Sequence, residues 1–423
     1  MDRRSEVWRC GARAAAAFVG AVALAVGAGL GPCPCAAGAA GPAAKLPKMQ
    51  TPYYWLYAKL EKPLLQETSA RLTAVAREYH RRTKGFKGAV TERMPVYIFT
   101  SKPDYVAAGG PESSEGIYAD GPILAYWDQS TTKRLWEILQ HECFHQFVWQ
   151  VIRGHWPAWL NEGMATYFEE GLWTGDGFVT GIIPENRLRH VKRMINEKKV
   201  KPFQDFMAMD NKTWSDTRGG EESWLDYCQA WSMVHFMLHG GDAKNRELLD
   251  KYMKWAAELP DTDWRRRQGD LPRRVFGSGL AKLQESWEKW WLAATEELCA
   301  DLRAEAAVSA LTCFLARAHL AGMRFASAEE FLQAAREEKL PSAPKDREDL
   351  WLPPALLKDH LAAAGKLRDW RLGKAGKLPA LRATFGDDLY LIGSFELKGA
   401  KTLDVTVERQ KASAAPPAKE KAK

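Results

Sequence analysis

Residues 141–145 constrain the fold and chemistry of this chain more than any other feature, because they read His-Glu-Cys-Phe-His. Residues four apart share one face of a helix, so His141 and His145 can point two imidazoles at one metal ion, with Glu142 at the edge of that face. Apolar residues recur at helical spacing from position 135 to 151, and a glycine and a proline follow. The pattern predicts an amphipathic helix that carries two metal ligands.

A second acidic element, Trp-Leu-Asn-Glu-Gly at residues 159–163, follows shortly afterwards. Zinc accepts nitrogen and oxygen ligands, and a catalytic zinc usually has three protein ligands and an open position for water. Glu162 is the obvious carboxylate to complete the set. We therefore predict a Zn²⁺ site made by His141, His145 and Glu162. The alternative is a plain buried helix in which the pattern arises by chance.

Composition bounds the class of protein. The 423 residues, 46% of them hydrophobic and 18 of them tryptophan, suffice for two or three domains with a substantial core. Five of the seven net positive charges lie in residues 1–40 and 411–423, so the body is nearly neutral. This balance gives no basis for a nucleic-acid partner.

The first 40 residues are typical of a signal peptide. Four arginines precede an apolar run over residues 14–30, and small residues then crowd positions 36–44. We expect an exported protein, located in the periplasm, the cell envelope or outside the cell, with no stable membrane span after cleavage. An uncleaved anchor is the alternative. Lipid anchoring at Cys33 is a further alternative, although Pro32 just before it is unfavourable.

Periodicity predicts a small β layer followed by a mainly helical half, an α+β fold. The strands expected are 95–99 and a hairpin of 116–118 with 123–127. The helices expected around the motif helix are 51–79, which Pro63 is expected to break or restart, and 159–170, 186–197, 222–239, 242–259 and 280–298. The predicted organisation is a signal peptide at 1–40, a metal-binding domain at 46–299, a helical region at 300–378, a small β appendage at 379–410 and a disordered tail at 411–423.

These motifs resemble the peptidase MA-like gluzincins, exported bacterial zinc peptidases that are distantly similar to thermolysin and the gluzincin aminopeptidases. The resemblance rests on His-Glu-x-x-His-Gln at 141–146 and on Trp-Leu-Asn-Glu-Gly-Met-Ala-Thr-Tyr-Phe-Glu at 159–169, and it covers roughly residues 95–298. It implies a gluzincin-like fold in which His141, His145 and Glu162 bind zinc and Glu142 is the general base.

Two departures from the aminopeptidase pattern refine this expectation, the first being that sixteen residues separate His145 from Glu162, slightly fewer than in those enzymes. The Gly-x-Met-Glu-Asn sequence that holds a substrate's free amine in the aminopeptidases is absent before the motif helix, which favours an endopeptidase. The metzincin pattern requires glycine at 148 and histidine at 151, and both positions are valine.

The expected chemistry is hydrolysis of a peptide or protein substrate through a zinc-activated water, with Glu142 passing the proton to the leaving amine. Tyr227 is the first choice of oxyanion donor, because residues 227–235 are similar to the helix that bears the catalytic tyrosine in aminopeptidase-type gluzincins. Its alternative role is packing against a neighbouring tryptophan. Tyr167 is the second choice, although it points about 140° away from Glu162 on a helix. Asn161 or Glu169 is expected to support the histidines.

A second class of function stays open, a non-proteolytic zinc-binding scaffold of the cell envelope that keeps the metallopeptidase fold. The intact Glu142 favours the enzyme, since a scaffold needs no base there. The sequence does not indicate an oligomeric state.

Overall fold

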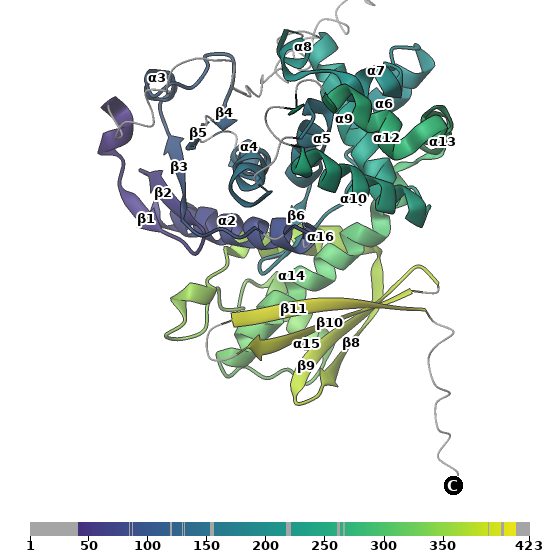
Figure 1. Ribbon diagram of the computed structural model, residues 1–423. Coiled ribbons are helices and arrows are strands. Elements are labelled where there is room, and N and C mark those ends of the chain that lie inside the picture. The colour runs from purple at the N-terminus through teal and green to yellow at the C-terminus, as the bar shows by residue number, and fades with distance from the viewer. Residues whose placement is uncertain are drawn as a thin grey trace, which may run out of the picture. The chain divides into compact units, whose positions relative to one another are not determined.

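The structure, a computed structural model, describes residues 41–411 apart from 84, 87, 119–120, 129, 131, 153–155, 217–220, 260–262, 265–266, 388 and 399–401. The described chain is a mixed α+β protein (Figure 1). It divides into two compact units, each discontinuous in sequence. The expected signal peptide and the tail after Lys411 lie outside the described residues.

Unit 1 comprises Met1–Leu60, Tyr79–Glu170 and Pro184–Thr295, and unit 2 comprises Glu61–Glu78, Gly171–Ile183 and Glu296–Lys423. The predicted division placed all of 46–299 in one domain. In the structure, the two short segments Glu61–Glu78 and Gly171–Ile183 cluster with the C-terminal part of the chain instead. Long-range packing of this kind leaves no local mark in the sequence.

Unit 1 contains a five-stranded sheet in the order β1-β2-β3-β5-β4. The β2/β3 and β3/β5 pairs are parallel, and the β1/β2 and β4/β5 pairs are antiparallel, so β4 is an edge strand. The strands are β1 (Lys48–Gln50), β2 (Tyr54–Ala58), β3 (Met94–Phe99), β4 (Gly116–Tyr118) and β5 (Ile123–Tyr126). The predicted strand at 95–99 and the predicted hairpin are confirmed.

The prediction that residues 51–79 are helical is wrong before Lys62, and the expected restart at Pro63 agrees with the start of the helix in the structure. Residues 54–58 form β2, in which Tyr54, Leu56 and Ala58 are buried and the two residues between them are half-buried. This alternation is the period-2 pattern of a strand with one face in the core. The helix α2 begins only at Lys62 and runs to Arg82.

The helical part of unit 1 surrounds the motif helix. Its α-helices are α3 (Lys102–Ala107), α4 (Thr132–Phe147), α5 (Ala158–Glu169), α6 (Glu185–Asn196), α7 (Phe203–Ala208), α8 (Asn211–Asp216), α9 (Glu221–His239), α10 (Ala243–Glu258), α12 (Leu271–Phe276) and α13 (Leu280–Ala293). Shorter turns are the 3₁₀-helices η3 (Gly41–Lys45), η6 (Gln268–Asp270) and η7 (Gly277–Gly279) and the π-helix η5 (Val148–Ile152), which continues α4.

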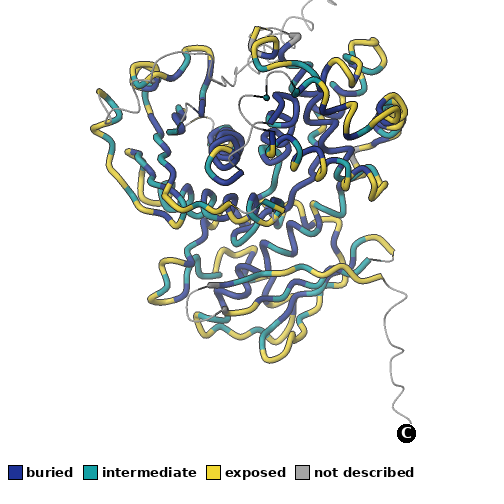
Figure 2. The backbone as a smooth tube through the Cα atoms, viewed as in Figure 1, coloured by how far each residue is buried: buried dark blue, intermediate teal, exposed yellow. Residues whose placement is uncertain are grey.

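The motif helix α4 is not amphipathic as predicted. From Leu135 to Phe147 every residue except Glu137 is buried, and most of the helix is dark blue in Figure 2. A helix buried all round is a central core element. The phenol of Tyr79 donates to the carbonyl of Gln140, and its ring packs on Phe144, Phe147 and Phe168. The core of unit 1 is therefore built around the motif.

Unit 2 contains an antiparallel sheet in the order β11-β10-β9-β8 and three α-helices after residue 299. Its elements are η8 (Glu296–Cys299), α14 (Ala300–Leu320), α15 (Ala328–Arg336), η9 (Glu348–Leu350), α16 (Pro354–Ala363), η10 (Ala364–Lys366), β8 (Leu367–Ala375), β9 (Leu378–Phe385), β10 (Leu389–Lys398) and β11 (Thr402–Lys411), together with the hairpin β6 (Leu172–Trp173) and β7 (Phe178–Val179). The prediction that 300–378 is helical is wrong for residues 367–375, which form β8.

Small residues let α14 lie close to this sheet. Ala304, Ala307 and Val308 pack against Ala383 and Leu391. The Arg317 guanidinium of α14 holds both carboxylate oxygens of Asp176, at 2.8 and 3.0 Å.

In the part of the chain that is described, no helix has both the length and the apolar character to cross a membrane.

Candidate metal centre

Helices α4 and α5 bring the three predicted metal ligands together. The Nε2 atom of His141 lies 3.2 Å from Oε2 of Glu162, and Nε2 of His145 lies 3.6 Å from the same oxygen. One ligand atom from each residue lies within 4.8 Å of the other two. All three side chains are at most 3% exposed. Two imidazoles and one carboxylate at this spacing are a donor set that suits zinc.

Several polar atoms at this point are buried without a hydrogen-bond partner. They are both ring nitrogens of His145 and the Oε1 atom of Glu162. Buried polar groups are nearly always hydrogen-bonded, because leaving them unpaired costs about 1–3 kcal/mol each. A cation held between Nε2 of His145 and the Glu162 carboxylate would satisfy this nitrogen and the Oε1 atom, so the residues present fit a metal ion.

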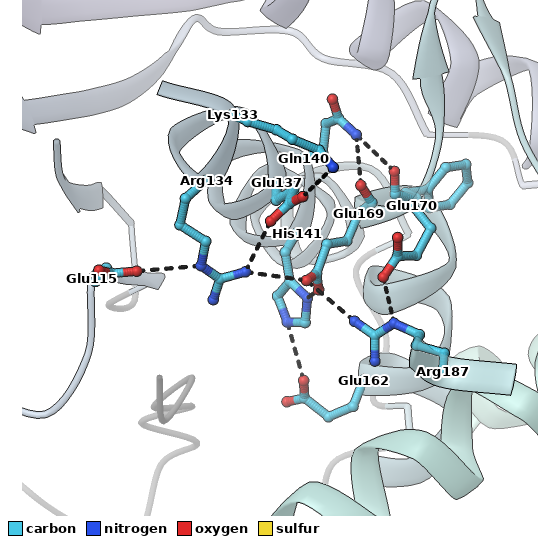
Figure 3. Close-up of polar contacts among 11 residues, drawn as sticks. Glu115, Lys133, Arg134, Glu137, Gln140, His141, Glu162, Glu169, Glu170 and Arg187 are labelled. Carbon is cyan, nitrogen blue, oxygen red and sulfur yellow. Dashed lines mark hydrogen bonds and ion pairs between the residues drawn. The ribbon is translucent and has the colours of Figure 1, made fainter. Parts of the chain in front are cut away.

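Glu169 holds the other side of the His141 ring (Figure 3). Its Oε2 atom lies 3.0 Å from Nδ1 of His141. Glu162 and Glu169 are seven residues apart, which returns to the same face of α5 after two turns. The predicted support of a histidine by Glu169 is confirmed, whereas the Oδ1 atom of Asn161 has no hydrogen-bond partner.

Two arginines hold Glu169 in turn. Nη1 of Arg134 and Nη2 of Arg187 lie 3.4 and 3.3 Å from its Oε1 atom, and Nε of Arg187 donates to Glu170 (Figure 3). Gln140 also donates to the backbone carbonyl of Glu169, at 3.0 Å. Two arginine side chains therefore hold the carboxylate that orients His141, and Gln140 fixes the backbone of the same residue.

Sequence reasoning did not find these arginines. Arg187 lies on α6, 46 residues after His141, and only the fold places it here. The sequence signal that could have found Arg187 is its place on the inner face of a strongly amphipathic helix, which predicts that the side chain is buried. A buried arginine needs a carboxylate partner.

The electrostatics of the site favour a positive charge between Glu162 and Glu169. Burial lowers the pKa of His141, but hydrogen bonds with both carboxylates and their charges outweigh this and raise it to about 10. Burial raises the pKa of Glu162, but the histidines lower it to about 2. The pKa of Glu169 is likewise about 2, because His141 and the arginines outweigh its burial.

The charges around the site also favour a divalent cation. Four carboxylates, those of Glu142, Glu162, Glu169 and Glu170, accompany the two guanidinium groups of Arg134 and Arg187. Arg134 also pairs with Glu115 and Glu137, so carboxylates outnumber the guanidinium groups around the site. A divalent cation beside neutral histidines reduces this excess of negative charge.

Glu142 lies next to the edge strand β4. Its Oε2 atom accepts a hydrogen bond of 2.7 Å from the backbone N–H of Tyr118. Gly116 permits this approach, because a Cβ atom there would lie 2.2 Å from Cγ2 of Ile138 on α4. Burial raises the pKa of Glu142, against the opposing charges of His141 and His145. A raised pKa suits a carboxylate that must accept a proton near neutral pH.

Tyr227 lies on α9 beside the histidines. Its ring centroid is 6.5 Å from that of His141, and the ring packs edge-on against Trp214 at 5.5 Å. The second predicted candidate, Tyr167, is buried, and its hydroxyl is hydrogen-bonded to Nε2 of His239 at 2.8 Å. Tyr227 thus has a ring contact to a candidate ligand, His141.

The glycine after Glu162 sets the distance between α5 and α9. A Cβ atom on Gly163 would lie 2.6 Å from the carbonyl oxygen of Ala230 and 2.9 Å from Cγ2 of Val234. Only glycine allows the two backbones to come this close. Gly163 thereby places Glu162 and the Tyr227 helix around the same point.

Comparisons with known proteins give one match. The family described as Protein of unknown function (DUF1570) matches residues 137–261, less than a third of the chain. This segment includes the three candidate ligands, Glu142 and Tyr227. No curated protein and no solved structure matches the chain.

Proposed function

We propose that this chain is an exported zinc-dependent endopeptidase with a gluzincin-like fold in unit 1. The observation that carries the proposal is the convergence of His141, His145 and Glu162, with unpartnered buried donor atoms, directly beside the buried carboxylate of Glu142. A scaffold needs the three ligands, but it has no need of a buried carboxylate with a raised pKa next to them.

Each residue of the site has its own role in the proposed reaction. Bound at His141, His145 and Glu162, Zn²⁺ supplies Lewis acidity toward a carbonyl and lowers the pKa of water. Glu142 accepts the proton of the attacking water and delivers it to the leaving amine. Tyr227 donates a hydrogen bond to the oxygen that becomes negative in the transition state. Glu169 keeps the His141 ring in one orientation and one tautomer.

One observation favours the second candidate, a non-proteolytic zinc-binding scaffold of the cell envelope. The Glu142 carboxylate accepts the Tyr118 N–H, and this contact ties the edge strand β4 to α4. A carboxylate retained for that contact alone would have a structural role. The two candidates predict different results when the Glu142 carboxylate loses its basicity. The enzyme should lose its activity, whereas the scaffold should be unaffected as long as the contact to β4 is kept.

Removal of the metal tests the proposal on the unmodified protein. We expect the mature protein, purified without chelators, to contain one zinc per chain by elemental analysis and to cleave members of a degenerate internally quenched peptide library. Dialysis against 1,10-phenanthroline should abolish cleavage, and a stoichiometric addition of Zn²⁺ should restore it. Zinc-loaded protein that cleaves no peptide and no unfolded protein in the screen would favour the scaffold. Cleavage that survives the loss of the metal would contradict the proposal.

Tyr227→Phe is expected to lower kcat about a hundredfold or more, because loss of one donor to the developing negative charge typically has this effect. KM should change little, since the hydrogen bond forms mainly in the transition state. Steady-state kinetics on one library-derived substrate measure both constants. Tyr167→Phe is the matched control, which removes a hydroxyl bonded to His239 and should leave kcat within a few-fold of wild type. The reverse pattern would assign the donor to Tyr167.

A further inference from the structure

Unit 2 contains a hollow of about 460 Å³ that has no part in the metal chemistry. It lies between the C-terminal end of α14, the loop before α15 and the β8–β9 hairpin. Its apolar lining is Leu315, Met323, Phe325, Leu372 and Pro379. A volume of this size falls within the range of ligand sites, roughly 300–1,000 Å³. We call it the unit 2 groove.

Cations surround the apolar lining. Arg324, Lys374 and Lys377 are exposed residues of the groove, and none of its lining residues is acidic. The guanidinium of Arg324 is held in place, because its Nη1 atom donates to the carbonyls of His319 and Met323, at 2.9 and 2.7 Å. An apolar interior with three cations and no carboxylate complements a ligand that joins an anionic group to an apolar one.

The strand that lines the groove is at the edge of its sheet. In the described sheet β8 pairs only with β9, and most of its residues are exposed (Figures 1 and 2). A bulge between Arg368 and Arg371 interrupts the first half of the strand. Residues 371–375 pair regularly with β9, and the outer edge of this segment has no strand neighbour in the described sheet, although α15 also packs against β8. Gly373 at the centre of this segment has open space where a side chain would be.

We propose that the unit 2 groove binds the C-terminal end of an extended peptide. The peptide backbone adds to β8 along residues 371–375, its last apolar side chain enters the lining, and its terminal carboxylate meets Arg324, Lys374 and Lys377. The occupant is extended because it pairs with a strand, and it ends at the groove because the cations gather where β8 turns into β9. This inference does not rest on the metal centre.

Binding of labelled peptides tests the proposal. The probes are fluorescein-labelled hexapeptide pools, degenerate at five positions and ending in leucine or phenylalanine, each made with a free carboxylate and as the amide. The protein is the mature chain carrying Glu142→Gln, so that the probes are not hydrolysed. By fluorescence anisotropy we expect saturable binding of the carboxylate pools and at least tenfold weaker binding of the amides. Lys374→Glu with Lys377→Glu should weaken carboxylate binding at least tenfold.

The matched control is Lys345→Glu with Lys358→Glu, which makes the same charge change at two exposed positions of unit 2 outside the groove. It should bind as the parent does, and circular dichroism should be the same for all variants. Equal binding of acids and amides, unchanged binding by the Lys374/Lys377 variant, or no binding up to about 1 mM, which is a free energy near −4 kcal/mol, would each overturn the proposal. Binding of decanoate without any peptide pool would assign the groove to a fatty anion instead.

Discussion

Glu142→Gln is expected to lower kcat by about three orders of magnitude or more while zinc content and thermal stability stay close to wild type. General acid–base catalysis by one side chain contributes about 10²–10⁴-fold, and here the same carboxylate handles the proton twice. Glutamine has the shape of glutamate, and its amide oxygen can still accept the Tyr118 N–H that Oε2 accepts at 2.7 Å. The substitution therefore removes the proton acceptor and spares the contact to β4.

Steady-state cleavage of the best library substrate, elemental analysis and thermal unfolding measure the three quantities on one preparation. Glu185→Gln is the matched control, because it removes the same charge from an exposed pair with Arg189 at the start of α6. It should keep full activity. If Glu142→Gln cleaves every substrate as fast as the wild type, the peptidase mechanism fails. A wild type that binds zinc but cleaves no substrate, together with a Glu142→Gln variant that keeps its zinc and its stability, would instead point to the structural role of a scaffold.

The parts of the fold that were predictable are those in which local pattern and tertiary burial agree. The helices at 186–197, 222–239 and 242–259 carry long apolar periods, and the structure has them as α6, α9 and α10 within a residue of the predicted ends. The start of the segment 51–79 was wrongly predicted to be helical, because Leu56, Leu60 and Leu64 are spaced as on a helix. The cluster of aromatic residues at Tyr54, Trp55 and Tyr57 was the stronger signal, because aromatic residues favour strands and pairing with β1 and β3 stabilises this one.

The candidate site also has a part that was predictable from the sequence and a part that was not. The i, i+4 histidines and Glu162 share short segments, so spacing alone predicts that they can meet, and the structure places them within 4.8 Å. Arg134, Arg187 and the Tyr118 N–H come from α4, α6 and β4. Their contacts depend on how helices cross and on how closely β4 approaches. Gly116 and Gly163 control these distances, and an isolated glycine in a sequence does not reveal which backbone it meets.

Substitution of a metal ligand is expected to weaken zinc binding far more than substitution of Glu169, which orients a ligand. His145→Ala should lose the bound zinc, since two ligands cannot complete a tetrahedral site. Glu169→Gln should keep zinc but bind it about ten- to a hundredfold more weakly, the usual result of altering a group that orients a ligand. The reason is that glutamine can still accept from Nδ1 of His141 but carries no charge for Arg134 and Arg187.

Elemental analysis after gel filtration measures occupancy, and competition with a chromophoric chelator measures affinity. His190→Ala is the matched control, because this histidine lies on α6, stacks on Trp224 and is not among the three candidate ligands. It should retain one zinc with wild-type affinity. Unchanged zinc content in His145→Ala would remove this residue from the ligand set. Equal loss of zinc in His145→Ala and Glu169→Gln would mean that Glu169 is itself a ligand, and that Glu162 and Glu169 both supply carboxylates from α5.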